Sequence, residues 1–208
     1  HWNEPFELAT PIGEGIAGYG SDDLRIEHNF IGCMDGFGYS QNVIRGRMHD
    51  GRGGTSRHTV VRNNVFYRCK AGAIRLPNHD HEIDGNCYAR VPQGFLWLTY
   101  PAPSEQLDLA AWQRFERFDL HGGYAAFEAK LDREQLTLTI TQGAKQITWD
   151  DRESDGYGSM QSVKTDIPVD FFGQPTDVLR HPGPFELYGN SATFRIDPRL
   201  NAKQRGGG

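Results

Sequence analysis

The sequence predicts an all-β solenoid, a parallel β-helix whose coils are followed by a short helix and a β-rich C-terminal cap. Three observations predict it. The first half of the 208-residue chain repeats with a fixed period, and the second half alternates apolar and polar residues as strands do. The chain also has 25 glycines and 11 prolines, which suit an architecture with many tight turns.

The repeat is defined by two markers that interleave along the chain. A glycine followed by an apolar residue recurs at Gly15, Gly36, Gly72 and Gly94. An asparagine within a short β-rich run recurs at Asn29, Asn64 and Asn86. Each glycine lies 14 residues before the next asparagine in two copies, and 7 or 8 residues separate an asparagine from the following glycine, so a coil takes 21 or 22 residues.

Coils of this length cannot bury their apolar faces singly, so they are expected to stack and share one core. Stacking predicts that the three asparagines form a ladder at a turn, each side-chain amide bonded to its equivalent in the next coil. It also predicts an inward column made of Ile16, Phe37, Ala73 and Phe95.

One coil carries an insertion, because 28 residues separate Gly36 from Asn64 where 14 are expected. The 14 inserted residues lie within residues 41–58, which contain four arginines and two histidines, namely Arg45, Arg47, Arg52, Arg57, His49 and His58. Because arginine binds carboxylate or sulfate with two parallel hydrogen bonds, this loop favours a charged saccharide. A solvated loop, or a docking surface for further coils, explains the same residues equally well.

The C-terminal half is predicted to form a cap over the coils. Residues 1–100 are assigned to the coils, 101–200 to the cap and 201–208 to a disordered tail. A helix is expected over residues 104–115 with Ser104 as its N-cap, then antiparallel strands within residues 126–131, 136–141 and 146–149, and one more within 163–169. The turn-rich segment from Phe171 to Tyr188 would close the stack.

Several short motifs resemble the C-terminal region of right-handed parallel β-helix repeat proteins of the pectate-lyase-like superfamily. They are Asp84-Gly-Asn-Cys-Tyr88, Leu107-Asp-Leu-Ala-Ala-Trp112, Asp170-Phe-Phe-Gly173 and Pro182-Gly-Pro-Phe185. The resemblance covers about residues 12–190 and implies a secreted or periplasmic, carbohydrate-active protein. It also implies that another chain or an N-terminal segment supplies further coils. The superfamily includes hydrolases, lyases, epimerases and tailspikes, so the fold alone does not name the reaction.

The leading hypothesis is a glycoside hydrolase that acts on a charged or decorated polysaccharide. Hydrolysis uses two carboxyl groups about 5 to 9.5 Å apart. Glu14 and Asp35 each precede a marker glycine, so they are predicted to lie at equivalent positions on adjacent coils and to act as the acid/base pair. His49 beside Asp50 is a second candidate proton carrier. Aspartates that bond their own turn are the competing explanation.

A polysaccharide lyase is the first alternative. It would need a basic residue to remove the proton α to a uronate carboxylate, often with an arginine or a cation that neutralises this carboxylate. Arg75 and the cluster Asn78-His79-Asp80-His81 could serve it. Calcium is expected only in this case, and a metal site made of His79 and His81 is disfavoured because Pro77 predicts a turn. Tyr39 and Trp97 are further candidate saccharide contacts. The second alternative is a non-catalytic subunit that completes a partner β-helix chain.

Composition excludes other classes. The net charge of −5 and the pI of about 5.9 disfavour nucleic acid as a partner. No apolar run approaches the roughly 18 residues of a membrane span. Three cysteines, an odd number without CxxC spacing, disfavour a disulfide framework or a zinc site, so no cofactor is expected.

Overall fold

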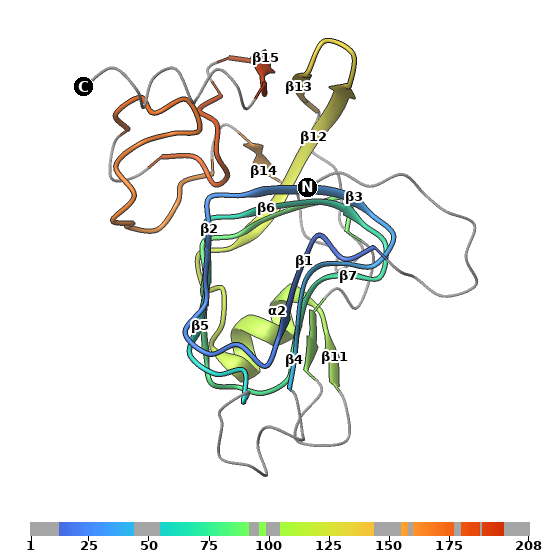
Figure 1. Ribbon diagram of the computed structural model, residues 1–208, viewed down its shortest axis with the longest axis vertical. Coiled ribbons are helices and arrows are strands. Elements are labelled where there is room, and N and C mark those ends of the chain that lie inside the picture. Colours follow the sequence, from blue (N-terminus) through green and yellow to red (C-terminus); the bar gives the residue numbers. More distant parts are fainter. Residues whose placement is uncertain are drawn as a thin grey trace.

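The computed structural model describes residues 13–43, 55–91, 96–98, 105–143, 155–157, 160–176, 180–187 and 189–197. These residues form an all-β structure with one short helical segment (Figure 1). Most strands belong to three sheets of largely parallel pairing. Within the described ranges, no helix is both long and apolar enough to span a membrane.

The three sheets are numbered in the order in which the chain first reaches them. Sheet 1 has the order β1 (Ile16–Tyr19), β4 (Phe37–Asn42), β7 (Gly72–Leu76), β10 (Leu96–Leu98) and β11 (Glu105–Leu107). Sheet 2 has the order β2 (Arg25–Glu27), β5 (Thr59–Arg62) and β8 (His81–Asp84). Sheet 3 has the order β3 (Phe30–Met34), β6 (Val65–Cys69), β9 (Cys87–Ala89), β12 (Gly123–Asp132), β13 (Thr137–Gln142) and β15 (Ser191–Arg195), with β14 (Asp155–Gly156) beside β12.

The chain visits the three sheets in turn, so each strand from β1 to β7 pairs in parallel with the third strand after it. Three successive strands, one in each sheet, are called a coil below. In Figure 1 the coils overlie one another and the sheets form the sides of the outline. Paired residues are 22 apart in β5–β8 and β6–β9, which confirms the predicted period. They are 35 apart in β2–β5 and β3–β6, so the insertion adds 35 − 22 = 13 residues.

The corners between sheets 2 and 3 repeat the same backbone conformation. His28, Asn63 and Gly85 occupy equivalent positions, with φ of 54°, 55° and 67°. This left-handed conformation is uncommon for residues with a Cβ, but glycine and asparagine adopt it most easily. The next residue in each case is a marker asparagine, so the corner holds the ladder in register.

The predicted asparagine ladder is confirmed. Asn64 Oδ1 accepts hydrogen bonds of 3.0 Å from both the backbone N–H and the side-chain amide of Asn29. Asn86 Oδ1 accepts the same two bonds from Asn64, at 3.0 and 3.1 Å. The ladder extends one step further than predicted, because Asp119 Oδ1 accepts a 3.0 Å bond from the backbone N–H of Asn86.

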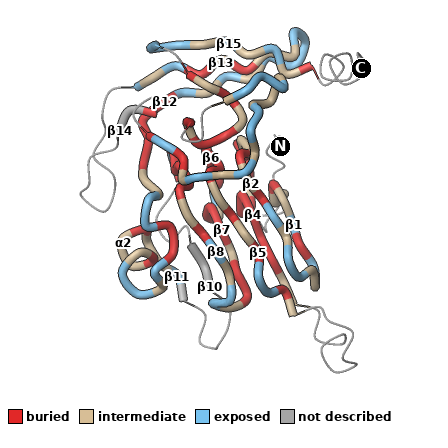
Figure 2. Tube along the Cα trace, turned by 90° about the vertical axis from the view of Figure 1, so that its left-hand side faces the viewer, coloured by how far each residue is buried: buried red, intermediate tan, exposed pale blue. Residues whose placement is uncertain are grey.

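Two apolar clusters hold the fold together. One fills the inside of the coils, where Phe66 and Tyr88 stack with ring centroids 5.7 Å apart. The other lies on the outer face of β3, β6 and β9, where it packs against the C-terminal part of the chain, and Tyr67 and Phe127 stack there with ring centroids 5.2 Å apart. Figure 2 shows both as bands of buried residues, one along the coils and one beneath β13 and β15. β6 and β9 are therefore packed on both faces.

Several sequence predictions need correction. Coil pairing does not stop at Trp97, because β12 begins parallel to β9 before it turns into the antiparallel β12–β13 pair. The helix starts at Leu109, with Asp108 and not Ser104 as N-cap, because Glu105–Leu107 pairs with β10. It comprises α2 (Leu109–Ala111) and the π-helical turn η1 (Trp112–Glu116).

The predicted antiparallel strands over 126–131 and 136–141 are confirmed by the β12–β13 pairing. The segment 163–169 forms no strand, and its β pairing is limited to an isolated bridge from Val169 to Pro175. The inward column is also wrong, because Ile16 is level with Tyr39 and Ile74, not with Phe37 and Ala73. The strand expected over 146–149, residue 95 and the tail 201–208 lie outside the described residues.

Candidate functional site

A polar cluster on the outer face of sheet 1 is centred on Arg75. Ile74 and Leu76, on either side of it in β7, are fully buried in the inner core, so Arg75 faces outward. Its Nε donates to Ser40 Oγ at 2.9 Å, and its Nη2 donates to Glu14 Oε1 at 3.0 Å and Asn42 Oδ1 at 3.1 Å. The guanidinium also lies over the Phe37 ring, 5.2 Å from the centroid. A quarter of the side chain is exposed, which leaves it open to a ligand.

The strand register explains why these residues meet. Ala17, Ser40, Arg75 and Trp97 are paired in sequence across β1, β4, β7 and β10, so they form one row. Tyr19, which is 57% exposed, is paired with Asn42 in the neighbouring row. The structure therefore brings Glu14 and Arg75 together and places the backbone of Trp97 beside them; the side chain of Trp97 lies outside the described residues.

The prediction that Glu14 and Asp35 occupy equivalent positions is wrong. Gly36 N donates to Gly13 O at 3.4 Å, and a Cβ on Gly15 would lie 2.6 Å from Gly38 O, so Gly15 is level with Gly38 and not Gly36. The register is thus shifted by two residues. Glu14 forms its ion pair with Arg75, whereas Asp35 forms one with Lys70. The two carboxylates do not occupy equivalent positions, and each is neutralised by its own cation.

The other predicted site residues are placed differently. Tyr39 is fully buried in the inner core, where burial raises the pKa of its hydroxyl, so it is not a saccharide contact. His79, with about half of its side chain exposed, forms an ion pair with Glu116 of η1. The five candidates Arg45, Arg47, His49, Asp50 and Arg52 lie outside the described residues.

Among the described residues outside this cluster, histidines and carboxylates do not gather as metal ligands. No group of three or more His, Cys, Asp or Glu side chains in the described ranges is arranged to hold a metal ion. His81 accepts a bond of 3.3 Å from Thr59 N through Nδ1, and burial lowers its pKa to about 4. It is therefore a neutral hydrogen-bond acceptor of the fold.

Sequence reasoning missed a cleft of about 620 Å³ between the first coil and the C-terminal region. Its polar end is formed by Glu27, His28, Asn29, Asp170 and Arg180. Its apolar walls are formed by Phe30, Leu131, Leu138, Ile167, Val169, Phe171, Pro184, Phe185 and Ile196. These residues are up to 169 positions apart in the chain, so no local motif could reveal the cleft.

His28 joins the first coil to the C-terminal region at the polar end of this cleft. His28 Nδ1 lies 3.1 Å from Arg180 Nε and 3.2 Å from Gly183 O, and its Nε2 lies 3.4 Å from Asn63 Nδ2. The ring is nearly buried, and burial together with the nearby Arg180 charge lowers the pKa of His28 to about 4. Asn63 adds three bonds to the same segment: Val163 N, Val163 O and Gly183 N, at 2.8, 3.0 and 2.6 Å.

Glu27 is the least satisfied charge in the cleft. Its side chain is 2% exposed, and Oε1 accepts bonds from Arg25 at 2.9 Å and Arg62 at 3.0 Å. Oε2 is buried and has no hydrogen-bond partner among the described residues. A buried carboxylate oxygen without a donor is costly, so this atom is a place where a further donor would be bound favourably.

Comparison with protein-family models, curated proteins and solved structures found no match to this chain. The class of the protein therefore rests on its own geometry. It is an all-β protein with three sheets of largely parallel pairing, and one sheet carries a polar cluster on its outer face.

Proposed function

We propose that the coils form a right-handed parallel β-helix of the pectate-lyase-like type, and that the chain acts on an acidic polysaccharide bound along the outer face of sheet 1. The observation that carries the proposal is the partly exposed guanidinium of Arg75, centred among Glu14, Ser40 and Asn42. The three-sheet path and the asparagine ladder support the β-helix.

A uronate is the saccharide unit that these residues fit. A guanidinium binds a carboxylate more strongly than it binds a neutral hydroxyl, because the hydrogen bonds are charge-assisted. Tyr19 adds an exposed ring beside Asn42, which is bonded to Arg75. The half-buried Asn42 supplies a polar position for a sugar hydroxyl when Arg75 turns to the substrate.

Elimination fits this cluster better than hydrolysis. A lyase neutralises the uronate carboxylate, removes the proton on the adjacent carbon, and expels the glycosidic oxygen from the next carbon as a double bond forms. We assign carboxylate binding to Arg75. Glu14, now 3.0 Å from Arg75 Nη2, would lose that partner to the substrate and become available as the proton acceptor.

A glycoside hydrolase at the same face is the alternative proposal. It would need a second carboxyl group about 5 to 9.5 Å from the first. Asp35 lies two residues out of register with Glu14 and forms an ion pair with Lys70, whereas Glu14 pairs with Arg75. Either reaction is consistent with a secreted or periplasmic protein, which we also propose.

The test is an assay of the purified chain on polygalacturonate, with and without added calcium, and with neutral glucan as the substrate control. We expect the ultraviolet absorbance of unsaturated uronate to appear on polygalacturonate alone. Arg75→Lys keeps the charge but loses the planar fork, so kcat/KM should fall by about 100-fold, as when a positioned donor to developing charge is removed. Arg195→Lys, on the exposed β15 strand, is the matched control and should leave the rate unchanged.

Two results would contradict the proposal. One is wild-type activity in the Arg75→Lys variant when its thermal unfolding is unchanged. The other is release of reducing ends without unsaturated product, which would instead identify a hydrolase.

A further inference from the structure

The two ends of the coil stack differ in how their sheet edges are treated. In the described part of the chain, β1, β2 and β3 are the edge strands of sheets 1, 2 and 3 and all belong to the first coil. At the opposite end, β11 covers β10, and the segment around Asp119 bonds to Ile83 O and Asn86. The first coil therefore presents three parallel-sheet edges together, which is a template for strand addition. We call this end of the stack the open end, and the end near β11 and Asp119 the closed end.

The asparagine ladder indicates the first property of a segment that could bind at the open end. Each downstream asparagine uses Oδ1 to accept two bonds from the coil before it, one from a backbone N–H and one from a side-chain amide. Asn29 stands at the same position in the first coil. Its Oδ1 therefore offers an acceptor for a backbone N–H and an amide of one further coil.

The charged residues of sheet 2 indicate a second property of the segment that would bind at the open end. Glu27, Arg62 and Asp84 are level across β2, β5 and β8, so acidic and basic residues alternate along the stack. Arg62 forms ion pairs with Glu27 and, at 3.0 Å, with Glu82. This alternation stops at Glu27, whose Oε2 has no hydrogen-bond partner in the part of the chain that the structure describes. A basic residue on one further coil would continue it.

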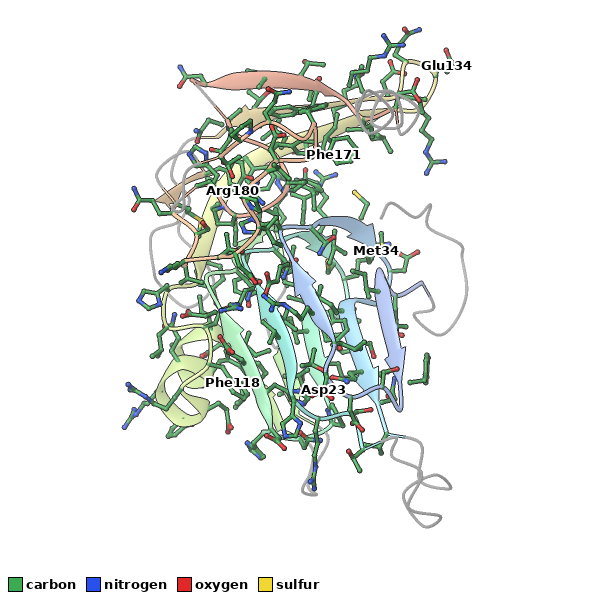
Figure 3. All side chains as sticks on the ribbon, turned by 60° about the vertical axis from the view of Figure 1, so that its left-hand side comes forward. Asp23, Met34, Phe118, Glu134, Phe171 and Arg180 are labelled. Atoms are coloured by element: carbon green, nitrogen blue, oxygen red, sulfur yellow. The ribbon has the colours of Figure 1, made fainter. Side chains whose placement is uncertain are left out.

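The apolar cleft indicates a third property of the segment that would bind at the open end. Phe30 is level with Val65 and Cys87, which pack outward from sheet 3 against the C-terminal strands. Leu131 and Leu138 of the β12–β13 hairpin line the cleft together with Phe30. In Figure 3 the hairpin end at Glu134 lies on the side of Met34 in β3, away from Phe118 at the closed end. The cleft thus offers an apolar wall for the outward side chain of one further strand.

We propose that this open end is a docking surface for a parallel β-coil presented by a partner polypeptide. The partner coil carries a basic residue level with Glu27, an asparagine level with Asn29 and an apolar residue level with Phe30. The inference rests on strand register and on Glu27, and it does not depend on the saccharide proposal.

The chain itself contains a coil with this chemistry, which provides the probe. Residues 57–76 carry Arg62, Asn64 and Val65 at the three required levels. A labelled synthetic peptide of this sequence would be titrated with the full chain, and hydrogen exchange would locate where it binds. We expect saturable binding and slower exchange of amides in β2 and β3.

Charge reversal makes the test specific. The peptide with Arg62→Glu should bind at least tenfold more weakly, because it places a second carboxylate against Glu27. In the chain, Glu27→Gln should weaken the Arg62 peptide and reduce the difference between the two peptides. Glu82→Gln in the chain is the matched control, because Glu82 bonds to the chain's own Arg62 on the side away from the first coil. This substitution should not change the affinity for either peptide.

Three outcomes would overturn the proposal: no saturable binding, equal binding of the two peptides, or protection outside the first coil. Self-association of the chain that excludes the peptide would also overturn it, because the edge would then belong to a second copy. The two peptides are compared on the unmodified chain. The comparison therefore tests the docking proposal even if Glu27→Gln lowers the stability of the fold.

Discussion

The asparagine ladder ends in two different ways. At the closed end, the fully buried Asp119 accepts bonds from Asn86 N at 3.0 Å, from Asn86 Nδ2 at 3.3 Å and from the hydroxyl of Tyr88. At the open end, Asn29 is only half-buried and donates its amide to Glu27 O and Asn64 Oδ1. A carboxyl group can end the ladder because it accepts from the last coil without needing a next coil to receive an amide. An asparagine at the first coil offers its Oδ1 as an acceptor for one further coil.

The titrating groups near the two ends respond to pH in opposite directions. Burial raises the pKa of Asp119 to about 7, whereas burial and Arg180 lower the pKa of His28 to about 4. Acidification from neutral pH therefore favours the folded form of the closed end and disfavours that of the open end.

The largest expected effect is on the pH dependence of stability at the closed end. The folded-state pKa of Asp119 lies above its ordinary value of 3.8, so its contribution is fully present below about pH 4 and is lost as the pH rises through 7. Asp119→Asn cannot titrate. Across this range the unfolding free energy of the wild type should fall by about 4 kcal/mol relative to the variant, as urea unfolding at a series of pH values would measure. Parallel pH curves for the two proteins would show that Asp119 is not the titrating group.

The next largest effect is the loss of unfolding free energy when an asparagine of the ladder is removed, which should be larger in the middle of the ladder than at its open end. Asn64→Ala removes the acceptor for two bonds from Asn29 and the donor to Ile26 O in a fully buried site, so it should cost about 3 kcal/mol. Asn29→Ala is the matched control. It removes a half-buried amide and should cost about 1 kcal/mol. Equal losses in urea unfolding would mean that the ladder is no stronger in its middle than at its edge.

The parts of the fold that sequence could predict are those that repeat. The period, the parallel coils and the ladder follow from markers that recur at fixed spacing. The Glu14–Asp35 prediction failed because both copies contain Gly-X-Gly, Gly13-Glu14-Gly15 and Gly36-Phe37-Gly38, and matching Gly15 with Gly36 shifts the register by two residues. A shift of two keeps side chains on the same face, so the alternation pattern could not expose the error.

Other features depend on contacts that sequence spacing does not encode. Asp119 was missed because it replaces the marker asparagine, and it lies 33 residues after Asn86 with a helical segment between them. The cleft was missed because His28 and Arg180 are 152 residues apart. Arg75 was identified as a candidate, but its partners Glu14, Ser40 and Asn42 become neighbours only through the pairing of β1, β4 and β7.

Amide hydrogen exchange, resolved by residue, tests the difference between the two ends most directly. The account predicts that the N–H groups of Asn64 and Asn86, each bonded to a buried side-chain oxygen of the next coil, exchange only by global unfolding. The N–H of Asn29 should exchange faster, by local opening of the first coil, and should slow when a coil peptide is bound. Exchange of Asn64 and Asn86 at the rate of exposed turns, or an order in which Asn29 is the slowest, would contradict the stacked ladder with one open end.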